Sequence, residues 1–340
     1  MTAHADSGRN AAEVRDLILG GQRAAMVHAV TRCGIPDLLA GGPVDLETLA
    51  QNSGTDASLL GRILRALAAS DLFAQTAEGL WALTPLGELL RRDRPDSLYP
   101  LAVYASEPWM RGAWDKLEYG LRSGEVPFHH ANNASYFEFL ERHPESRRIF
   151  DSVMASNQMP RVATLATAYD WSQFAHIVDV GGGHGILLLN LLKAHPGIIG
   201  TVFDLPQVAA AARRFAEWEG LADRMDAVAG DFFSEAPPHG DAIILSRILH
   251  DWRDTDCDTI LRHCRASLNP GAALLVLEQV IEPGQGQRAA KEADIHMHVL
   301  LGGKERTREE FTALFAASGF VLTDVVATPT TNQIVVGRAV

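Results

Sequence analysis

Residues that could bind a nucleoside follow three successive apolar runs of the sequence. The first run closes as DVGGGHG, residues 179–185, and its glycines would let a ligand approach the backbone at the start of a helix. The second run ends at Asp204, a carboxylate that could accept both hydroxyls of a ribose. The third ends at Asp231 and Phe232. Asp231 could accept a hydrogen bond from the exocyclic amine of a base, and Phe232 could stack on the ring of that base. A structural turn and a helix cap are the alternatives for the glycines and for Asp204, but the occurrence of all three in order favours a nucleoside site.

The spacing of the glycines excludes the dinucleotide fingerprint G-x-G-x-x-G. Counted from Gly181, the third glycine would stand at position 186, which is Ile186, and counted from Gly182 the second would stand at His184. The turn is therefore tighter than that of an NAD-binding fold and leaves less room for a pyrophosphate.

His250 lies in the segment ILSRILHDWRD, residues 244–254, and is a candidate general base. An imidazole with a pKa of about 6.5 could accept the proton of a hydroxyl nucleophile as the new bond forms. A carboxylate bonded to the other ring nitrogen would fix the tautomer and stabilise the imidazolium. A surface pair with Asp251 is the alternative, and the segment alone does not decide between them.

Seven short β-branched runs after residue 174 predict a doubly wound α/β sheet that would position these residues. The runs are AHIVDV, IIGTVF, MDAVAG, DAIILS, AALLVLEQ, FVLTDVVA and QIVVGRA. Five alternate with helical stretches and are predicted to be parallel. Only TPTTN separates the last two, which is too short for a crossover, so the final strand is predicted to be antiparallel. Ligands bind beyond the carboxyl ends of such strands, where the glycine turn, Asp204, Asp231 and His250 all stand.

The region from about residue 10 to 170 is predicted to be mainly helical, and it contains a winged-helix pattern. Residues 44–90 indicate a helix, a turn, a second helix and two short strands, with Asp45 and Asp56 as helix caps. Residues 45–94 carry five basic and seven acidic residues, and the second helix has only Arg62 and Arg65. That balance disfavours DNA binding and favours a packing or dimerisation role.

The composition is that of an ordinary soluble chain of 340 residues with a net charge of −12. This charge disfavours nucleic acid as a partner, and the absence of a long apolar window argues against a membrane span. Three cysteines do not make a disulfide framework. With a polar N-terminus that lacks the pattern of a signal peptide, these features predict a cytoplasmic protein.

The motifs DVGGGHG, FDLP, GDFF, LSRILHDW and GGKERT together resemble those of the S-adenosylmethionine-dependent small-molecule O-methyltransferases, the plant caffeic acid-type and actinomycete tailoring enzymes. The resemblance covers nearly the whole chain. It implies a class I methyltransferase Rossmann-like sheet of seven strands, S-adenosylmethionine as cofactor, a homodimer, and a small hydroxylated acceptor, aromatic and from antibiotic or other secondary metabolism. The implied domains are a winged-helix dimerisation domain at 1–100, a helical linker contributing to the acceptor pocket at 101–170 and a catalytic domain at 171–340.

The resemblance also assigns a cofactor site residue by residue. Gly181 and Gly183 would line the methionine moiety, Asp204 would bind the ribose, and Asp231 and Phe232 would hold adenine. Ser246 stands where plant members carry a lysine that reaches the cofactor, so the contact at this position is left open. The full predicted set is Asp179, Gly181, Gly183, Asp204, Leu205, Gly230, Asp231, Phe232, Ser246, Arg247, Asp251 and Trp252.

The same resemblance implies that His250 is the general base of an in-line methyl transfer, flanked by Glu278 and Glu305. Without this resemblance, the alternative for Glu278 is an ordinary acid at a strand end, and the alternative for Glu305 is an ion pair with Lys304 or Arg306. The predicted acceptor pocket comes from the helices before the first strand and from the segment before GGKERT. Its residues are Trp109, Phe150, Met154, Asn157, His296, Met297 and Leu300, although such residues are also typical of a plain core.

No metal site is predicted, because His296 and His298 have an i, i+2 spacing and lack a Cys or carboxylate set. Two other functions stay open: the same fold and cofactor serving hydroxylation, decarboxylation or rearrangement, and a winged-helix regulator that senses the nucleoside. The His250, Glu278 and Glu305 set favours methyl transfer, and the charge of the winged helix disfavours the regulator. The acceptor and the position of methylation are not identified by the sequence.

Overall fold

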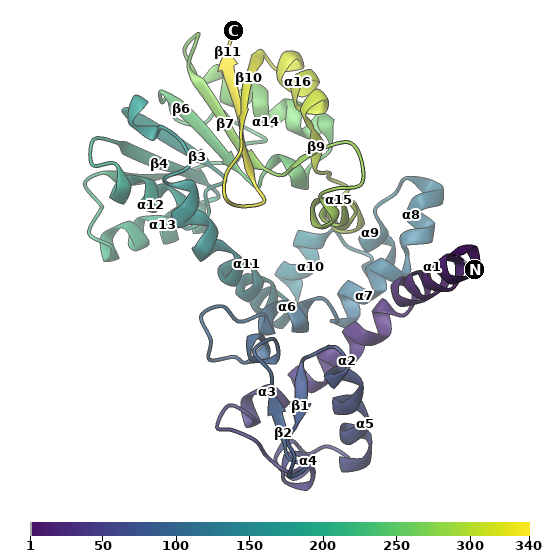
Figure 1. Cartoon of the computed structure of the whole chain (residues 1–340). Coiled ribbons are helices and arrows are strands. Elements are labelled where there is room, and N and C mark those ends of the chain that lie inside the picture. Colours follow the sequence, from purple (N-terminus) through teal and green to yellow (C-terminus); the bar gives the residue numbers. More distant parts are fainter. Residues whose placement is uncertain (1) are drawn as a thin grey trace. The chain divides into compact units, whose positions relative to one another are not determined.

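In the computed structural model the chain folds into two compact units, whose elements are labelled in Figure 1. One unit comprises residues 1–112 and 137–157, and the other comprises residues 113–136 and 158–340. The structure describes residues 2–340, apart from the side chains of residues 2–9, 155–161 and 163. Residues 101–170, predicted as one helical linker, are divided between the two units.

The larger unit is built on a seven-stranded sheet in the order β10-β11-β7-β6-β3-β4-β5. Strands β3 to β7 of this sheet are parallel, and β11 runs antiparallel to both of its neighbours, β7 and β10. The predicted topology, with a reversed last strand, is confirmed. The strands are β3 (His176–Val180), β4 (Ile199–Asp204), β5 (Met225–Ala229), β6 (Ala242–Ser246), β7 (Ala273–Glu278), β10 (Phe320–Val326) and β11 (Gln333–Ala339).

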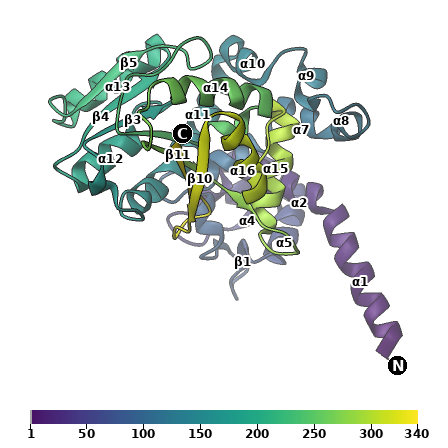
Figure 2. The ribbon, with the colours of Figure 1, turned by 90° about the horizontal axis from the view of Figure 1, so that it is seen from above.

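Helices cover both faces of this sheet (Figures 1 and 2). Successive side chains of a strand point to opposite faces, so Ile177 joins the core under one layer of helices and Val178 the core under the other. Burial on both faces explains why the strands are continuous apolar runs. The first layer contains α12 (Ile186–Ala194), α13 (Pro206–Trp218) and the end of α11 (Pro144–Leu165), and the second contains α14 (Asp254–Ala266) and α16 (Arg308–Ala317).

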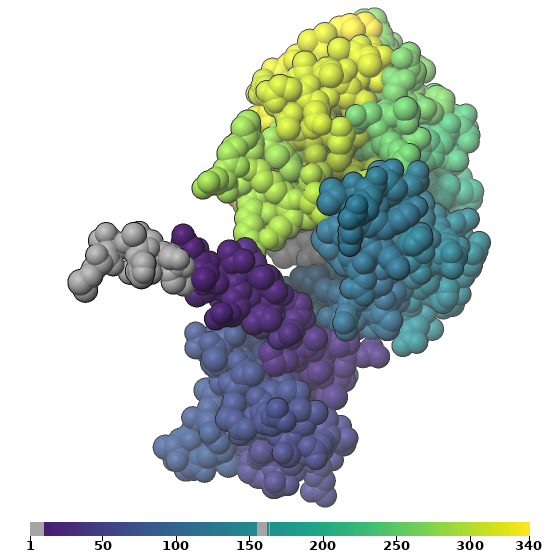
Figure 3. Space-filling view, turned by 90° about the vertical axis from the view of Figure 1, so that its right-hand side faces the viewer, coloured from purple at the N-terminus to yellow at the C-terminus, as the bar shows by residue number. Residues whose placement is uncertain are grey.

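A short parallel pair joins two segments beyond the carboxyl end of β7. Strand β8 (Val280–Ile281) pairs with β9 (Arg306–Thr307), so that Val280 lies opposite Arg306. This pair, which the sequence does not predict, brings the GGKERT segment to the end of β7. The other elements of this unit are η2 (Trp171–Gln173), η3 (Leu249–Asp251), α8 (Leu117–Ser123), α9 (Pro127–Asn132) and α15 (Arg288–Leu301). In the space-filling view the C-terminal segments, coloured light green to yellow, form one continuous surface (Figure 3).

The smaller unit contains the predicted winged helix. Asp45 accepts a hydrogen bond from the backbone N–H of Thr48 at 2.9 Å, and Asp56 accepts one from Leu59 at 2.7 Å, so each caps its helix as predicted. The elements are α1 (Thr2–Ile18), α2 (Gly20–Arg32), α3 (Ile35–Leu38), α4 (Leu46–Ser53), α5 (Ala57–Ala68), β1 (Phe73–Gln75), β2 (Trp81–Leu83), η1 (Gly87–Leu90), α6 (Tyr99–Tyr104), the first part of α7 (Pro108–Asp115), whose last residues belong to the larger unit, and α10 (Tyr136–Arg142). Among the described residues of the whole chain, no helix has the length and apolarity to cross a membrane.

Candidate active site

The turn after β3 combines glycines required by packing with one that faces open space. Gly181, Gly183 and Gly185 have φ angles of 69°, 60° and 76°, a left-handed conformation that glycine adopts without a steric penalty. A Cβ on Gly185 would lie 2.1 Å from the Met225 methyl group, whereas a Cβ on Gly183 would meet no atom within 4 Å. Gly185 is therefore packed closely against its neighbours, and Gly183 leaves its backbone accessible to a ligand.

Asp204, at the end of the neighbouring strand β4, is bonded to this turn. Its Oδ2 accepts from the backbone N–H of Gly183 at 2.9 Å, and its Oδ1 accepts from that of Leu205 at 2.7 Å. Burial raises the pKa of Asp204. Each oxygen keeps further acceptor capacity, so the carboxylate could also receive hydroxyl donors. Leu205 is 45% exposed.

The residues after β5 form a turn beside an aromatic cluster. Asp231 accepts from the backbone N–H of Phe233 at 2.9 Å and from the hydroxyl of Ser234 at 3.2 Å. The ring of Phe232 lies 6.3 Å from that of Trp252 at an interplanar angle of 74°. A Cβ on Gly181 would lie 3.6 Å from Phe232 Cε1, so this ring borders the glycine turn. At the neighbouring position Gly230 a Cβ would lie 2.2 Å from Phe203, which makes that glycine a packing requirement.

Asp179 is buried at the end of β3 with no hydrogen-bond partner for either carboxyl oxygen among the described residues. Burial, and after it the charge of Asp204, raises the pKa of Asp179 to about 7. A buried carboxyl group left without a partner is costly in a native fold. A ligand that carries hydrogen-bond donors or positive charge would offset this cost.

His250 is held between two carboxylates in the 3-10 turn η3 that follows β6. Its side chain is buried, with Nδ1 2.9 Å from Glu305 Oε1 and Nε2 3.3 Å from Asp251 Oδ1. Burial by itself lowers the pKa of His250, but Asp251 and Glu305 together outweigh it and raise the pKa above the ordinary 6.5. Each ring nitrogen therefore lies next to a carboxylate, Nδ1 at hydrogen-bond distance from Glu305 and Nε2 farther away, beside the half-buried Asp251.

The two predicted partner glutamates contact different parts of His250. Glu305 binds the ring, whereas Glu278 Oε1 accepts from the backbone N–H of His250 at 3.1 Å. The second oxygen of each glutamate is buried and lacks a hydrogen-bond partner among the described residues. Burial raises the pKa of Glu278. Burial also acts to raise the pKa of Glu305, but the hydrogen bond and charge of His250, with smaller contributions from Arg247 and Gln279, together outweigh it and lower that pKa.

The ion pairs offered above as alternatives for Glu305 are not formed. Lys304 Nζ lies 3.0 Å from Asp254 and 2.9 Å from Glu310, and Arg306 lies 2.8 Å from Asp254. Glu305 instead receives hydrogen bonds from His250 and, at 3.1 Å, from the amide of Gln279. Gln279 is absent from the predicted site, because nothing in its local sequence distinguishes it from other residues after a strand.

The remaining predicted cofactor residues are Ser246, the last residue of β6, and Arg247, which follows it; both are half-buried. Arg247 has a left-handed φ of 56°, which is uncommon for a residue with a side chain. This conformation turns the chain from β6 toward η3, three residues before His250.

The predicted acceptor residues are divided between the two units. In the larger unit, His296 stacks on Trp114 with ring centroids 5.9 Å apart. Burial, and after it the charge of Arg247, lowers the pKa of His296 to about 4, so this imidazole is neutral at pH 7. Met297 is half-buried and Leu300 is buried on the same helix, α15.

In the smaller unit, Trp109 is buried against Tyr104 and Phe139, each with ring centroids 5.5 Å away. Phe150 and Met154 are half-buried on α11. The side chain of Asn157 lies outside the described residues. Trp109 therefore contributes to the core of its own unit, and its predicted place in the acceptor pocket stays a prediction.

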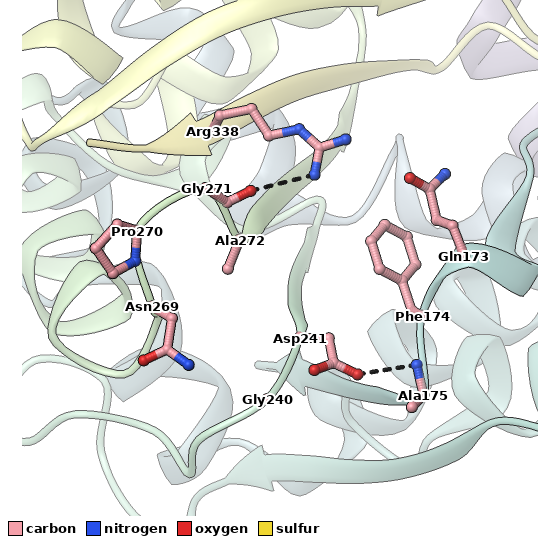
Figure 4. A pocket seen from close by; sticks show the side chains of 10 residues that line it. All are labelled: Gln173, Phe174, Ala175, Gly240, Asp241, Asn269, Pro270, Gly271, Ala272 and Arg338. Carbon is pink, nitrogen blue, oxygen red and sulfur yellow. Dashed lines mark hydrogen bonds between the residues drawn. The ribbon is translucent and has the colours of Figure 1, made fainter.

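A cavity of about 390 Å³ lies at the opposite end of the strands from the glycine turn and His250, at the amino ends of β3, β6 and β7 (Figure 4). Asp241 there accepts a hydrogen bond from the backbone of Ala175 at 2.9 Å, and Arg338 donates to the carbonyl of Gly271 at 3.4 Å. None of the predicted site residues lines it. Within the described part of the chain, no group of three or more His, Cys, Asp or Glu residues is arranged to hold a metal ion.

Comparison with known proteins identifies the family. Residues 114–321 match the model of the O-methyltransferase domain, and residues 16–93 match that of the O-methyltransferase dimerisation domain. The chain belongs to this family of S-adenosylmethionine-dependent O-methyltransferases, which form homodimers through the N-terminal domain. The predicted family, cofactor and dimeric assembly are thereby confirmed.

Three relatives illustrate the similarity. A phenazine O-methyltransferase of Lysobacter antibioticus is 40% identical over 325 residues, covering 95% of each chain. The structure of a mitomycin 7-O-methyltransferase has a TM-score of 0.90 at 34% identity and covers 98% of this chain and 100% of that one. An O-methyltransferase from neocarzinostatin biosynthesis, in complex with S-adenosylmethionine and 2-hydroxy-5-methyl naphthoic acid, has a TM-score of 0.80 at 32% identity, covering 93% and 96%.

Proposed function

We propose that this O-methyltransferase methylates a hydroxyl group of a small aromatic metabolite, with His250 as the general base and Glu305 as the carboxylate that orients it. The observation that carries the proposal is the 2.9 Å contact between His250 Nδ1 and Glu305 in a buried site. This contact leaves Nε2 as the nitrogen that accepts the proton. Glu278, which binds the backbone of the same turn, holds the base from a second direction.

The proposed cofactor residues offer groups that fit S-adenosylmethionine. The open backbone at Gly183, the acceptor capacity of Asp204 and the unpartnered carboxyl group of Asp179 suit an amino acid moiety and a ribose. Phe232, with Trp252 nearby, offers an aromatic surface for a base. When bound, the cofactor supplies an electrophilic methyl group on a sulfonium.

The chemistry explains why a base is required. A phenol with a pKa of about 10 is almost wholly neutral at pH 7, and its oxygen is then a weak nucleophile. His250 would remove the proton as the oxygen attacks, and general bases of this kind contribute about 10²- to 10⁴-fold to the rate. The carboxylate of Glu305 would stabilise the imidazolium that results.

The acceptor is proposed to be aromatic on two grounds. The relatives named above act on or bind a phenazine and a naphthoic acid. In this chain Trp114 and the neutral ring of His296 present a stacked pair on α7 and α15, a surface that suits a flat and uncharged ring. We further propose that the enzyme serves secondary metabolism in the cytoplasm, where its three free cysteines would stay reduced.

The test is incubation with methyl-labelled S-adenosylmethionine and a panel of hydroxylated phenazines, naphthoates and simple phenols. We expect label in at least one product, a loss of about 10²- to 10⁴-fold in His250→Ala, and unchanged binding of the cofactor to that variant by calorimetry. His239→Ala is the matched control. His239 is remote from the site, because it is hydrogen-bonded to Asn269, which lines the cavity at the amino ends of the strands. Cofactor binding without any label transfer would refute the proposed reaction, and full turnover by His250→Ala would refute the proposed base.

A further inference from the structure

Arg306 is a fully buried arginine whose guanidinium is bound to the turn that carries His250. Its side chain has no exposed surface. Nη1 donates to the carbonyl of Leu249 at 2.8 Å, and Nη2 donates to the carbonyl of Trp252 at 3.0 Å. These two carbonyls lie on either side of His250 and Asp251 in the chain, so one planar group bridges both ends of the turn.

Other groups anchor the same guanidinium. Asp254 Oδ1 accepts from Nε at 3.0 Å and from Nη2 at 2.8 Å, and Cys257 Sγ lies 3.2 Å from Nη2. The thiol of Cys257 also donates to the carbonyl of Leu249 at 3.2 Å. The arginine is thus fixed to the start of α14 while its other donors hold the turn.

Gly303, in the same GGKERT segment, lies directly against this turn. A Cβ at this position would stand 2.0 Å from the carbonyl oxygen of His250 and 2.6 Å from the carbonyl carbon of Asp251. Only a residue without a side chain permits this approach. The segment therefore contacts the turn at three points: the backbone of Gly303, the carboxylate of Glu305 on the ring, and the guanidinium of Arg306 on the flanking carbonyls.

We propose that Arg306 is a positioning residue for the methyl transfer and that Gly303 permits the contact through which it acts. Arg306 fixes the backbone of the turn while its neighbour Glu305 binds the ring, so the orientation of His250 is set by two consecutive residues. The inference rests on the proposed role of His250. Lysine would not replace this arginine, because a single ammonium cannot span two carbonyls as a planar fork of donors does.

The test compares Arg306→Met and Arg306→Lys with the unaltered homodimer. We expect kcat to fall by about 100-fold in both, the effect of a misplacement on the order of 1 Å, with little change in the KM for S-adenosylmethionine. By NMR of ¹⁵N-histidine-labelled enzyme, we expect the far-downfield Nδ1 proton of His250, hydrogen-bonded to Glu305, to weaken or disappear. The pKa of His250 should fall at the same time, because that hydrogen bond raises it.

The matched control is Arg262→Met. Arg262 also pairs with a carboxylate on α14, Asp258 at 2.8 Å, and donates to a carbonyl, Ala317 at 2.9 Å, but it does not touch the turn. If Arg306→Met does not fold, Gly303→Ala gives a second test, because it moves the turn and leaves the arginine in place. Its control is Gly197→Ala, where a Cβ meets nothing within 4 Å.

Folded Arg306→Met and Gly303→Ala variants with an unchanged Nδ1 signal, His250 pKa and kcat would overturn the proposal. Failure of the proposed base is a separate result, because it would show as full turnover by His250→Ala. The NMR signal reports the position of the ring in either case and so decides the role of Arg306 independently of activity.

Discussion

At the scale of single residues, the site is defined by how carboxylates are distributed around one imidazole. Glu305 binds the ring of His250, Glu278 binds its backbone, and Asp251 lies 3.3 Å from the remaining ring nitrogen. Negative charge around a buried imidazole favours its protonated form, which explains the raised pKa of His250. A base with a raised pKa is a stronger proton acceptor, but more of it is protonated at neutral pH.

The pH dependence of the reaction follows from this charge distribution. Only the neutral imidazole can accept a proton, so we expect kcat to rise with pH through an apparent pKa above 6.5. Glu305→Gln removes a charge that raises the pKa of His250, so the rise should move to lower pH while the plateau falls. Glu278→Gln keeps an oxygen for the backbone N–H and should move the rise less. Profiles of kcat against pH for the three proteins check this, and an unshifted profile in Glu305→Gln would contradict it.

At the scale of elements, the turn from β3 to α12 separates glycines with different tasks. Gly185 packs against Met225 and begins α12, whereas Gly183 is open and is bonded to Asp204. Both have a left-handed φ, so any substitution carries a conformational cost of about 1–2 kcal/mol. The remaining cost depends on what a side chain would meet at each position.

We therefore expect two alanine substitutions in this turn to have different effects. Gly183→Ala should fold with a modest loss of stability and bind S-adenosylmethionine more weakly, because the added methyl group occupies space proposed for the ligand. Gly185→Ala should lose more stability, because its methyl group must displace the Met225 side chain. Thermal unfolding and calorimetric titration of both variants provide the measurements. Equal stability losses, or full affinity in Gly183→Ala, would count against this assignment.

At the scale of the whole molecule, dimerisation depends on surface that a single chain leaves uncovered. Leu17 and Ile18, at the start of the region that matches the dimerisation domain, are 67% and 75% exposed at the end of α1. Such exposed apolar side chains in a dimerisation domain are candidates for the interface.

Replacing both by glutamate should weaken the dimer. Each apolar side chain contributes about 1.5–3 kcal/mol when buried, so we expect the dissociation constant to rise by about 100-fold or more. Sedimentation velocity across a concentration series measures this. Leu121→Glu is the control, because Leu121 is 85% exposed on α8, outside the dimerisation domain. A double variant that dimerises as tightly as the parent would place the interface elsewhere.

Much of this architecture was predictable because its signals are local. Short apolar, β-branched runs mark the strands, Asp45 and Asp56 mark helix starts, and the short TPTTN connection requires a hairpin. The glycine turn is likewise visible in the sequence, because residues with left-handed φ angles favour one amino acid. These properties depend on neighbours in the chain, so a single sequence determines them.

The contacts of His250 were decided only by the tertiary structure. Glu278 lies 28 residues away in the chain and Glu305 lies 55 residues away. The family resemblance names both as partners, but not which one binds the ring. The pairing of β8 with β9 sets that geometry, and it also brings Gln279 to Glu305 and Arg306 to the turn. Two-residue strands leave almost no periodic signal, so the sequence by itself determined the elements and the residue types, and long-range packing decided which side chains meet.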